Sequence, residues 1–232
     1  MNPDLRGSSA HVIVDDVEAP VLVDDDVHHL ARVLRLRDGE SVSATDGRGA
    51  WRLLEWRQGG AHPVGPVHHD RRVAALTVAA AMPKGDRLEW MVEKLTETGV
   101  DRIVLLHCDR GVVRWDADRA ERSLDRLRRV VRAAATQSRR VWLPTLEGPV
   151  EAAAFLAATP RAVLCEPAGP SLAAVEPLPE CLVIGPEGGF STAELATGHG
   201  RAALGPTILR VETAALVAAA QWTALCPLDH GA

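Results

Sequence analysis

Residues 181–194 have the sequence CLVIGPEGGFSTAE, and this stretch decides the fold class. Its first four residues, Cys181–Ile184, form a short apolar run that predicts a buried strand. Ser191 and Glu194 have the spacing of a capping box, which predicts that a helix begins beside this serine. Between the two lies the loop of residues 185–189, whose three glycines allow a ligand to approach the backbone closely. The stretch therefore predicts one strand–loop–helix step of an α/β sheet.

Strands and helices alternate on both sides of this step. Apolar or β-branched runs predict strands at residues 73–81, 103–107, 162–165 and 207–211. Periodic apolar positions predict helices at residues 87–98, from Asp116 or Asp118 to about residue 137, and at residues 213–225, with Gly99 ending the first of them. This alternation predicts an α/β domain over residues 73–232, built on a parallel sheet that is covered on both faces.

Residues 1–72 have a different pattern. Short β segments are predicted at residues 11–14, 21–23, 41–45 and 50–55, separated by turn sequences, with one helix at residues 27–36. We expect a small β-barrel domain here. Residues 62–72 contain Pro63, Gly65 and Pro66 and are predicted to be a linker to the second domain.

Composition excludes several classes of protein. The 232 residues are 47% hydrophobic with a net charge of −5, which argues against disorder, and no apolar run is long enough to span a membrane. The polar N-terminus carries no signal-peptide pattern. The four cysteines lie far apart without a C-x-x-C pair, so we expect reduced thiols in a cytoplasmic protein and no metal site.

Charge is distributed unevenly along the chain. The net charge is −3 over residues 1–72, +4 over residues 73–145 and −6 over residues 146–232. Eight arginines but only two acidic residues lie between Arg119 and Arg140. The acidic total alone argues against a nucleic-acid partner, whereas the basic middle segment provides a surface on which one can bind.

Three loops are candidates for chemistry, because ligands of parallel α/β sheets bind beyond the carboxyl ends of the strands. They are residues 166–169, 185–191 and 204–213. No P-loop, dinucleotide fingerprint or Gly-x-Ser-x-Gly sequence occurs, which argues against nucleoside triphosphates, dinucleotides and a serine nucleophile. Arg210 and Glu212 would project to one side of an extended segment, either as part of a site or as a surface ion pair.

At this point the sequence resembles a known family. The loop of residues 185–191 with Glu194, and the segment of residues 204–214, closely resemble the ribosomal RNA small subunit methyltransferase E family of the SPOUT class. Residues 29–35 with 38–39, 84–89, 93–100 and 137–140 resemble further family motifs, so the resemblance covers nearly the whole chain. Thr98, Thr136 and the pair Pro206-Thr207 depart from the usual family residues.

The resemblance implies S-adenosylmethionine-dependent methylation of uridine N3 in 16S ribosomal RNA of the small subunit. It implies a SPOUT sheet with a C-terminal trefoil knot over residues 73–232, a PUA-like RNA-binding barrel over residues 1–72, and a homodimer. The cofactor-binding residues that it implies are Leu164, Glu166, Ile184, Gly185, Pro186, Glu187, Gly188, Gly189, Leu204, Gly205, Ile208, Leu209, Val211, Thr213 and Ala214. The RNA-binding residues that it implies are Arg32, Arg35, Lys84, Arg110, Gln137, Ser138 and Arg140.

Loss of the N3 proton leaves negative charge on the flanking carbonyls, so a cation beside that base would lower the barrier. We expect Arg210 in this role, with Glu212 either as the base or as the residue that orients Arg210. Two alternatives stay open at this point: a related SPOUT enzyme acting on transfer RNA or a ribose hydroxyl, and a non-catalytic ribosome-assembly protein that binds RNA.

Overall fold

The computed structural model describes residues 2–72 and 74–226. The chain folds into two compact units. The first contains Met1–Arg72 together with Arg132–Leu143, and the second contains Val73–Val131 and Pro144–Ala232. The sequence-based division at residue 72 left residues 132–143 with the second domain, whereas the structure packs them with the first.

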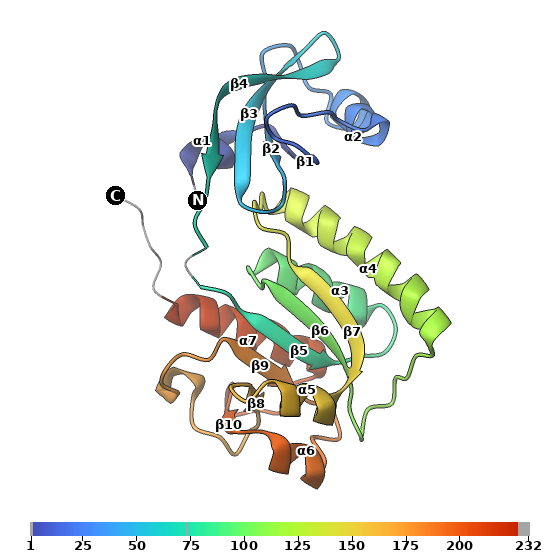
Figure 1. Cartoon of the computed structure of the whole chain (residues 1–232), viewed down its shortest axis with the longest axis vertical. Coiled ribbons are helices and arrows are strands. Elements are labelled where there is room, and N and C mark those ends of the chain that lie inside the picture. The colour runs from blue at the N-terminus through green and yellow to red at the C-terminus, as the bar shows by residue number, and fades with distance from the viewer. Residues whose placement is uncertain (1, 73, 227–232) are drawn as a thin grey trace. The chain divides into compact units, whose positions relative to one another are not determined.

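The first unit is built on a four-stranded sheet in the order β1-β2-β3-β4 (Figure 1). The β1 and β2 strands are parallel, and the other two pairs are antiparallel. Val42, Ala44 and Leu54 are completely buried and form its core with Trp56 and Leu30. The elements of this unit are α1 (Pro3–Gly7), β1 (Ala10–Ile13), α2 (Asp24–His28), the π-helical turn η1 (His29–Val33), β2 (Ser41–Thr45), β3 (Ala50–Arg57) and β4 (Gly60–His69).

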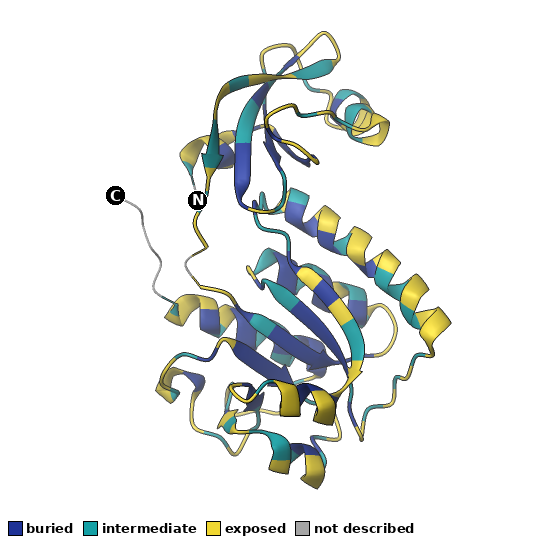
Figure 2. Ribbon diagram, viewed as in Figure 1, coloured by how far each residue is buried: buried dark blue, intermediate teal, exposed yellow. Residues whose placement is uncertain are grey.

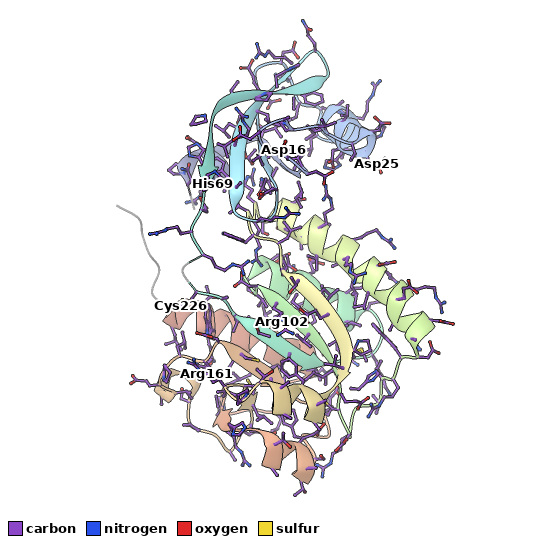
Figure 3. All side chains as sticks on the ribbon, viewed as in Figure 1. Asp16, Asp25, His69, Arg102, Arg161 and Cys226 are labelled. Carbon is purple, nitrogen blue, oxygen red and sulfur yellow. The ribbon has the colours of Figure 1, made fainter. Side chains whose placement is uncertain are left out.

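Three predictions for this unit were wrong. The predicted linker is largely β4, which pairs with β3 and ends at His69, labelled in Figure 3. Because β4 is an edge strand with a partner on one side only, it tolerates Pro63 and Pro66, which have no backbone N–H to donate. Residues 21–23 form no strand. The predicted helix of residues 27–36 is instead α2 followed by η1, and it ends before Arg35, whose φ of 55° is incompatible with a right-handed helix.

The segment of residues 132–143 is held to this sheet by hydrogen bonds. The Thr45 hydroxyl and the Gly49 N–H both donate to the Val141 carbonyl, at 3.2 and 2.8 Å. His11 is buried between Ser43 Oγ, 2.8 Å from its Nδ1, and the Arg140 carbonyl, 3.3 Å from its Nε2. Burial lowers the pKa of His11 to about 4. The neutral imidazole with its proton on Nε2 therefore donates to the Arg140 carbonyl and accepts from Ser43.

The second unit contains a six-stranded parallel sheet in the order β10-β8-β9-β5-β6-β7. Its elements are β5 (Thr77–Ala81), α3 (Arg87–Glu97), β6 (Arg102–His107), α4 (Ala117–Gln137), whose end belongs to the first unit, β7 (Thr145–Glu151), α5 (Ala152–Ala158), β8 (Val163–Cys165), the 3-10 turn η2 (Leu172–Ala174), β9 (Cys181–Ile184), α6 (Thr192–Thr197), β10 (Gly200–Ala202) and α7 (Val211–Leu225). The predicted α/β class and parallel sheet are confirmed.

The central strands of this sheet are buried on both faces. All four residues of β9 are buried, as are four successive residues in each of β5 and β6 (Figure 2). Successive side chains of a strand point to opposite faces, so both faces must be covered. The α7 helix packs on β5, β9 and α3, while α5 packs on β7 and α6.

The strand predicted at residues 207–211 was wrong. Residues 204–210 form a loop, and α7 begins at Val211 with Arg210 as its N-cap residue. The strand beside β8 is instead β10, a short edge strand that the sequence analysis missed together with β7 and α5. In the first predicted strand only Thr77–Ala81 is extended in the sheet, and Val73 lies outside the described residues.

Over residues 2–72 and 74–226, no helix has the length and apolar character needed to cross a bilayer. The same residues contain no group of three or more His, Cys, Asp or Glu side chains arranged to hold a metal ion.

Candidate functional site

Three loops of the second unit surround one cavity of about 320 Å³, which we call the three-loop cavity. They follow β8, follow β9 and precede α7. Thirteen of the fifteen predicted cofactor-binding residues line it; Leu164 is buried in β8, and Thr213 lies in the first turn of α7 without lining it. The lining residues are Cys165, Glu166, Pro167, Ile184, Gly185, Pro186, Glu187, Gly188, Gly189, Leu204, Gly205, Thr207, Ile208, Leu209, Val211 and Ala214.

The wall that follows β9 is made mostly of backbone. A Cβ atom added to Gly185 would lie 2.9 Å from the Phe190 ring, and one added to Gly188 would lie 3.3 Å from the Cβ of Arg110. Gly189 has a φ of 70° and donates its N–H to the Pro186 carbonyl at 2.8 Å, which closes a tight turn. Side chains at Gly185 and Gly188 would press on the neighbours that shape the cavity, and one at Gly189 would be strained by the positive φ.

A hydrogen-bond network fixes this loop at the start of α6. The predicted capping box is present: Ser191 Oγ accepts from the Glu194 N–H, and Glu194 Oε2 accepts from the Ser191 N–H at 2.7 Å. The second oxygen of this buried carboxylate accepts from the Asp109 N–H at 3.0 Å. Arg110, which follows β6, donates to the Gly188 carbonyl at 3.1 Å. The loop is therefore held to the end of β6, and Arg110 supports the cavity wall directly.

Arg210 and Glu212 do not share one side of a strand, as the sequence analysis assumed. Arg210 is exposed, and its guanidinium makes no hydrogen bond or ion pair with the described residues. Glu212, in the first turn of α7, is only 7% exposed. Its Oε1 accepts from Arg87 Nη1 at 3.3 Å, so its partner is Arg87 and not Arg210.

Sequence reasoning missed Arg87. Its Nη1 also lies 3.7 Å from Glu187 Oε1, so one guanidinium joins the loop after β9 to the start of α7. One signal was present in the sequence: Arg87 is the first residue of α3, where the helix dipole disfavours a cation. A cation at such a position indicates a carboxylate partner elsewhere in the fold. Glu212 Oε2 is buried without a hydrogen-bond partner among the described residues.

The three-loop cavity has the chemistry of a site for a cationic, partly apolar ligand. Its lining contains two carboxylates, Glu166 and Glu187, and no lysine or arginine. Ile184, Leu204 and Leu209 provide apolar surface for a flat ring. Cys165 also lines the cavity, but burial raises the pKa of its thiol to about 12, so it is a neutral wall and not a nucleophile. S-adenosylmethionine, with an adenine ring and a sulfonium, fits this donor set.

The predicted RNA-binding residues fall into two groups. Arg32, Arg35, Gln137, Ser138 and Arg140 belong to the first unit. Lys84 and Arg110 belong to the second unit. The Ser138 hydroxyl donates to the Ala134 carbonyl at 2.7 Å, and the Arg140 carbonyl is bonded to His11.

The comparisons with known proteins agree with this architecture. Residues 70–223 match the model of an RNA methyltransferase domain, and residues 22–55 match that of an RNA methyltransferase PUA domain. These matches identify the class: the chain is one of the RNA methyltransferases that carry a PUA domain.

The relatives narrow the class further. Ribosomal RNA small subunit methyltransferase E of Mycobacterium bovis is 36% identical over 232 residues, covering 88% of this chain and 86% of that protein. A probable rRNA-methyltransferase from Porphyromonas gingivalis superposes with a TM-score of 0.78 at 27% identity, over 93% of this chain and 98% of that one. Ribosomal RNA small subunit methyltransferase E from Neisseria gonorrhoeae, bound to S-adenosyl methionine, superposes with a TM-score of 0.75 at 25% identity, over 93% and 97%. The chain belongs to the ribosomal RNA small subunit methyltransferase E family.

Proposed function

We propose that this protein uses S-adenosylmethionine to methylate N3 of a uridine in 16S ribosomal RNA of the small ribosomal subunit. Family membership supports the activity on small-subunit ribosomal RNA. The observation that carries the cofactor assignment is the acidic, glycine-walled lining of the three-loop cavity. Because that lining includes no lysine or arginine, the carboxylates of Glu166 and Glu187 are left to balance the sulfonium charge.

The bound cofactor supplies an electrophilic methyl group on a positively charged sulfur. The backbone of the loop of residues 185–189 would pack against this group and orient it, because Phe190, Arg110 and the capping box hold the loop in place. Correct orientation of two reactants is itself a large part of catalysis. We therefore assign to Gly185 and Gly188 the close backbone approach to the cofactor.

Arg210 is proposed to stabilise the negative charge that develops on the uracil carbonyls when N3 loses its proton. It stands at the positive end of the α7 dipole, and its side chain is free to reach a base at the cavity mouth. Glu212 is proposed as the proton acceptor, since its Oε2 has no hydrogen-bond partner among the described residues while Arg87 holds its Oε1.

The two domains are proposed to divide the work. Residues 1–72 would bind RNA as a PUA-like barrel through Arg32 and Arg35, and residues 73–232 would bind the cofactor and carry out the transfer. Gln137, Ser138 and Arg140, which pack with the first unit, would extend the RNA surface from there. A trefoil knot formed by the C-terminal segment, and a homodimer, follow from the family resemblance; light scattering on the purified protein tests the dimer.

Nucleoside mass spectrometry tests this function. Deleting the gene should remove one N3-methyluridine from 16S ribosomal RNA, and re-expression of the intact chain should restore it. Re-expression of the Arg210→Ala variant should not. Loss of a transfer-RNA or ribose methylation instead, with 16S ribosomal RNA unchanged, would contradict the proposal and favour a related enzyme of the same class.

A further inference from the structure

The second unit contains another cavity, of about 430 Å³, which no part of the proposed transfer step uses. Three segments surround it: the turn before α3 with its first residues, the strap of residues 112–115 that follows β6, and the first half of α4. Its size is within the usual range for a bound small molecule or nucleotide. The lining residues are Pro83, Lys84, Gly85, Asp86, Leu88, Glu89, Val112, Val113, Arg114, Trp115, Arg119, Ser123, Arg126 and Leu127.

The lining has an excess of positive charge. Four of its residues are cationic and two are acidic. Arg126 pairs with Glu89, and Arg114 pairs with Glu151 outside the cavity. The ammonium of Lys84 and the guanidinium of Arg119 make no hydrogen bond or ion pair with the described part of the chain. Two cations without such partners in the lining of one cavity favour an anionic group such as a phosphate.

An aromatic ring stands on the strap. Trp115 is half-buried, packs against the core of the unit and lines the cavity. Its backbone N–H donates to His107 Nε2 at 3.2 Å, while Arg114 donates to the Cys108 carbonyl at 2.9 Å. The strap is therefore anchored to the end of β6. A ring held in this way offers a flat surface on which a base can stack at low entropic cost.

The cavity lies beside the same chain segment that supports the proposed cofactor site. Lys84, Asp86 and Glu89 line it, whereas Arg87, in the middle of that segment, pairs with Glu187 on the three-loop cavity and with Glu212. Arg87 therefore links the start of α3 to the loop after β9 and to the start of α7. A nucleic-acid strand that delivers one base to the three-loop cavity would place an adjoining nucleotide near this ion-paired segment.

We propose that the cavity between residues 83–89, the strap and the first half of α4 binds an unpaired nucleotide that adjoins the methylated uridine. Its base stacks on Trp115, and its phosphate binds Lys84 and Arg119. This assignment rests on the proposed function, and it adds a second base-binding position that selects single-stranded or splayed RNA over a paired helix. We call it the flanking-nucleotide pocket.

Fluorescence anisotropy with two labelled probes tests the pocket. One probe is a short oligouridylate, and the other is a ribose-phosphate strand of the same length without bases. Wild-type protein should prefer the oligouridylate. Trp115→Leu keeps an apolar side chain against the core but removes the ring, so it should weaken oligouridylate binding by about tenfold and leave the abasic probe unaffected.

Arg119→Ala should act differently, because a phosphate contact carries no base information. It should weaken both probes by about threefold to tenfold and lower the slope of log affinity against log salt by about one, with Arg119→Lys restoring part of the loss. Arg128→Ala is the matched control. It removes the same charge from the same helix. Arg128 is nine residues further along α4, which places it on the opposite side of the helix, and it does not line the pocket.

Three results would overturn the proposal. Trp115→Leu could leave the preference for bases intact, Arg119→Ala could lose no more affinity than Arg128→Ala, or polyglutamate could compete as well as oligouridylate, which would indicate an acidic peptide partner.

Melting curves of each variant show whether it folds, and Trp115→Phe, which retains a smaller ring, should bind at an intermediate level. Failure of the wild type to methylate 16S ribosomal RNA would refute the proposed function, whereas normal methylation with unaltered binding by both pocket variants would refute this pocket alone.

Discussion

Replacing Arg87 by alanine should lower the free energy of unfolding of the second unit by about 2 kcal/mol, because it leaves a buried carboxylate without its cation. Glu212 is 7% exposed, and the Arg87 side chain is 34% exposed. Removing one partner of a fully buried pair costs about 3–5 kcal/mol, whereas an exposed pair contributes less than about 1 kcal/mol. A pair with one buried and one partly exposed member lies between these limits.

Thermal unfolding followed by circular dichroism measures the effect. A loss of about 2 kcal/mol should lower the Tm by about 4–8 °C for a unit of this size. Adding Glu212→Gln to Arg87→Ala should restore most of the stability, since the uncompensated charge is removed. Arg128→Ala is the control: its partner Asp125 lies closer, at 2.7 Å, but both side chains are more than half exposed. The reasoning is refuted if Arg87→Ala and Arg128→Ala cost the same, or if Glu212→Gln gives no rescue.

Three further predictions concern the reaction, the first unit and the cavity wall. Arg210→Ala should slow single-turnover methylation at least about a hundredfold, the effect of one lost oxyanion contact, while calorimetry finds S-adenosylmethionine affinity within about twofold; near-normal turnover would remove Arg210 from the mechanism. Folding lowers the pKa of His11 from 6.5 to about 4, so between these pH values the unfolded chain binds a proton that the folded protein does not. The free energy of unfolding is therefore highest above pH 6.5 and falls by about 3 kcal/mol as the pH falls toward 4. Melting curves should accordingly show a wild-type stability loss in that window that His11→Gln lacks, and parallel pH profiles would contradict this. Cys165→Ala should retain methylation within about twofold, because a thiol with a pKa near 12 is no nucleophile, and a loss of all turnover in that variant would count against a neutral wall.

Local sequence signals located the parts of the fold that depend on neighbouring residues. The strands Ser41–Thr45 and Cys181–Ile184 have the predicted bounds, and the capping box of Ser191 and Glu194 begins α6 as expected. These elements combine apolar runs with turn or cap residues, so their local sequence preference agrees with the structure that the tertiary contacts favour.

The errors arose where position in the sheet decided the structure. Pro63 and Pro66 indicated a linker, but an edge strand tolerates proline, and only the sheet order reveals which strand is at the edge. The apolar and β-branched residues within 207–211 indicated a strand, yet β10 already occupies the place beside β8. Short runs of this kind do not distinguish a strand from a loop that lines a cavity.

In the candidate site, too, local motifs were predicted correctly and contacts between distant residues were missed. The motifs that carry the family resemblance located nearly all residues of the three-loop cavity, because those residues lie in contiguous loops. Arg87 escaped because its partners Glu187 and Glu212 are about a hundred residues or more away in sequence. The segment of residues 132–143 joined the first unit through contacts equally distant in sequence, such as that between His11 and Arg140.

Calorimetric titration of S-adenosylmethionine into the intact protein tests the central claim, that the three-loop cavity is the cofactor site. Wild-type protein should bind the cofactor, and Gly188→Val should abolish binding, since a Cβ there would lie 3.3 Å from the Arg110 Cβ and the branched side chain would also occupy the cavity wall. Gly7→Ala, at a glycine with open space around it, should bind as the wild type does. Absence of binding by the wild-type protein, or unchanged affinity in Gly188→Val, would contradict the account.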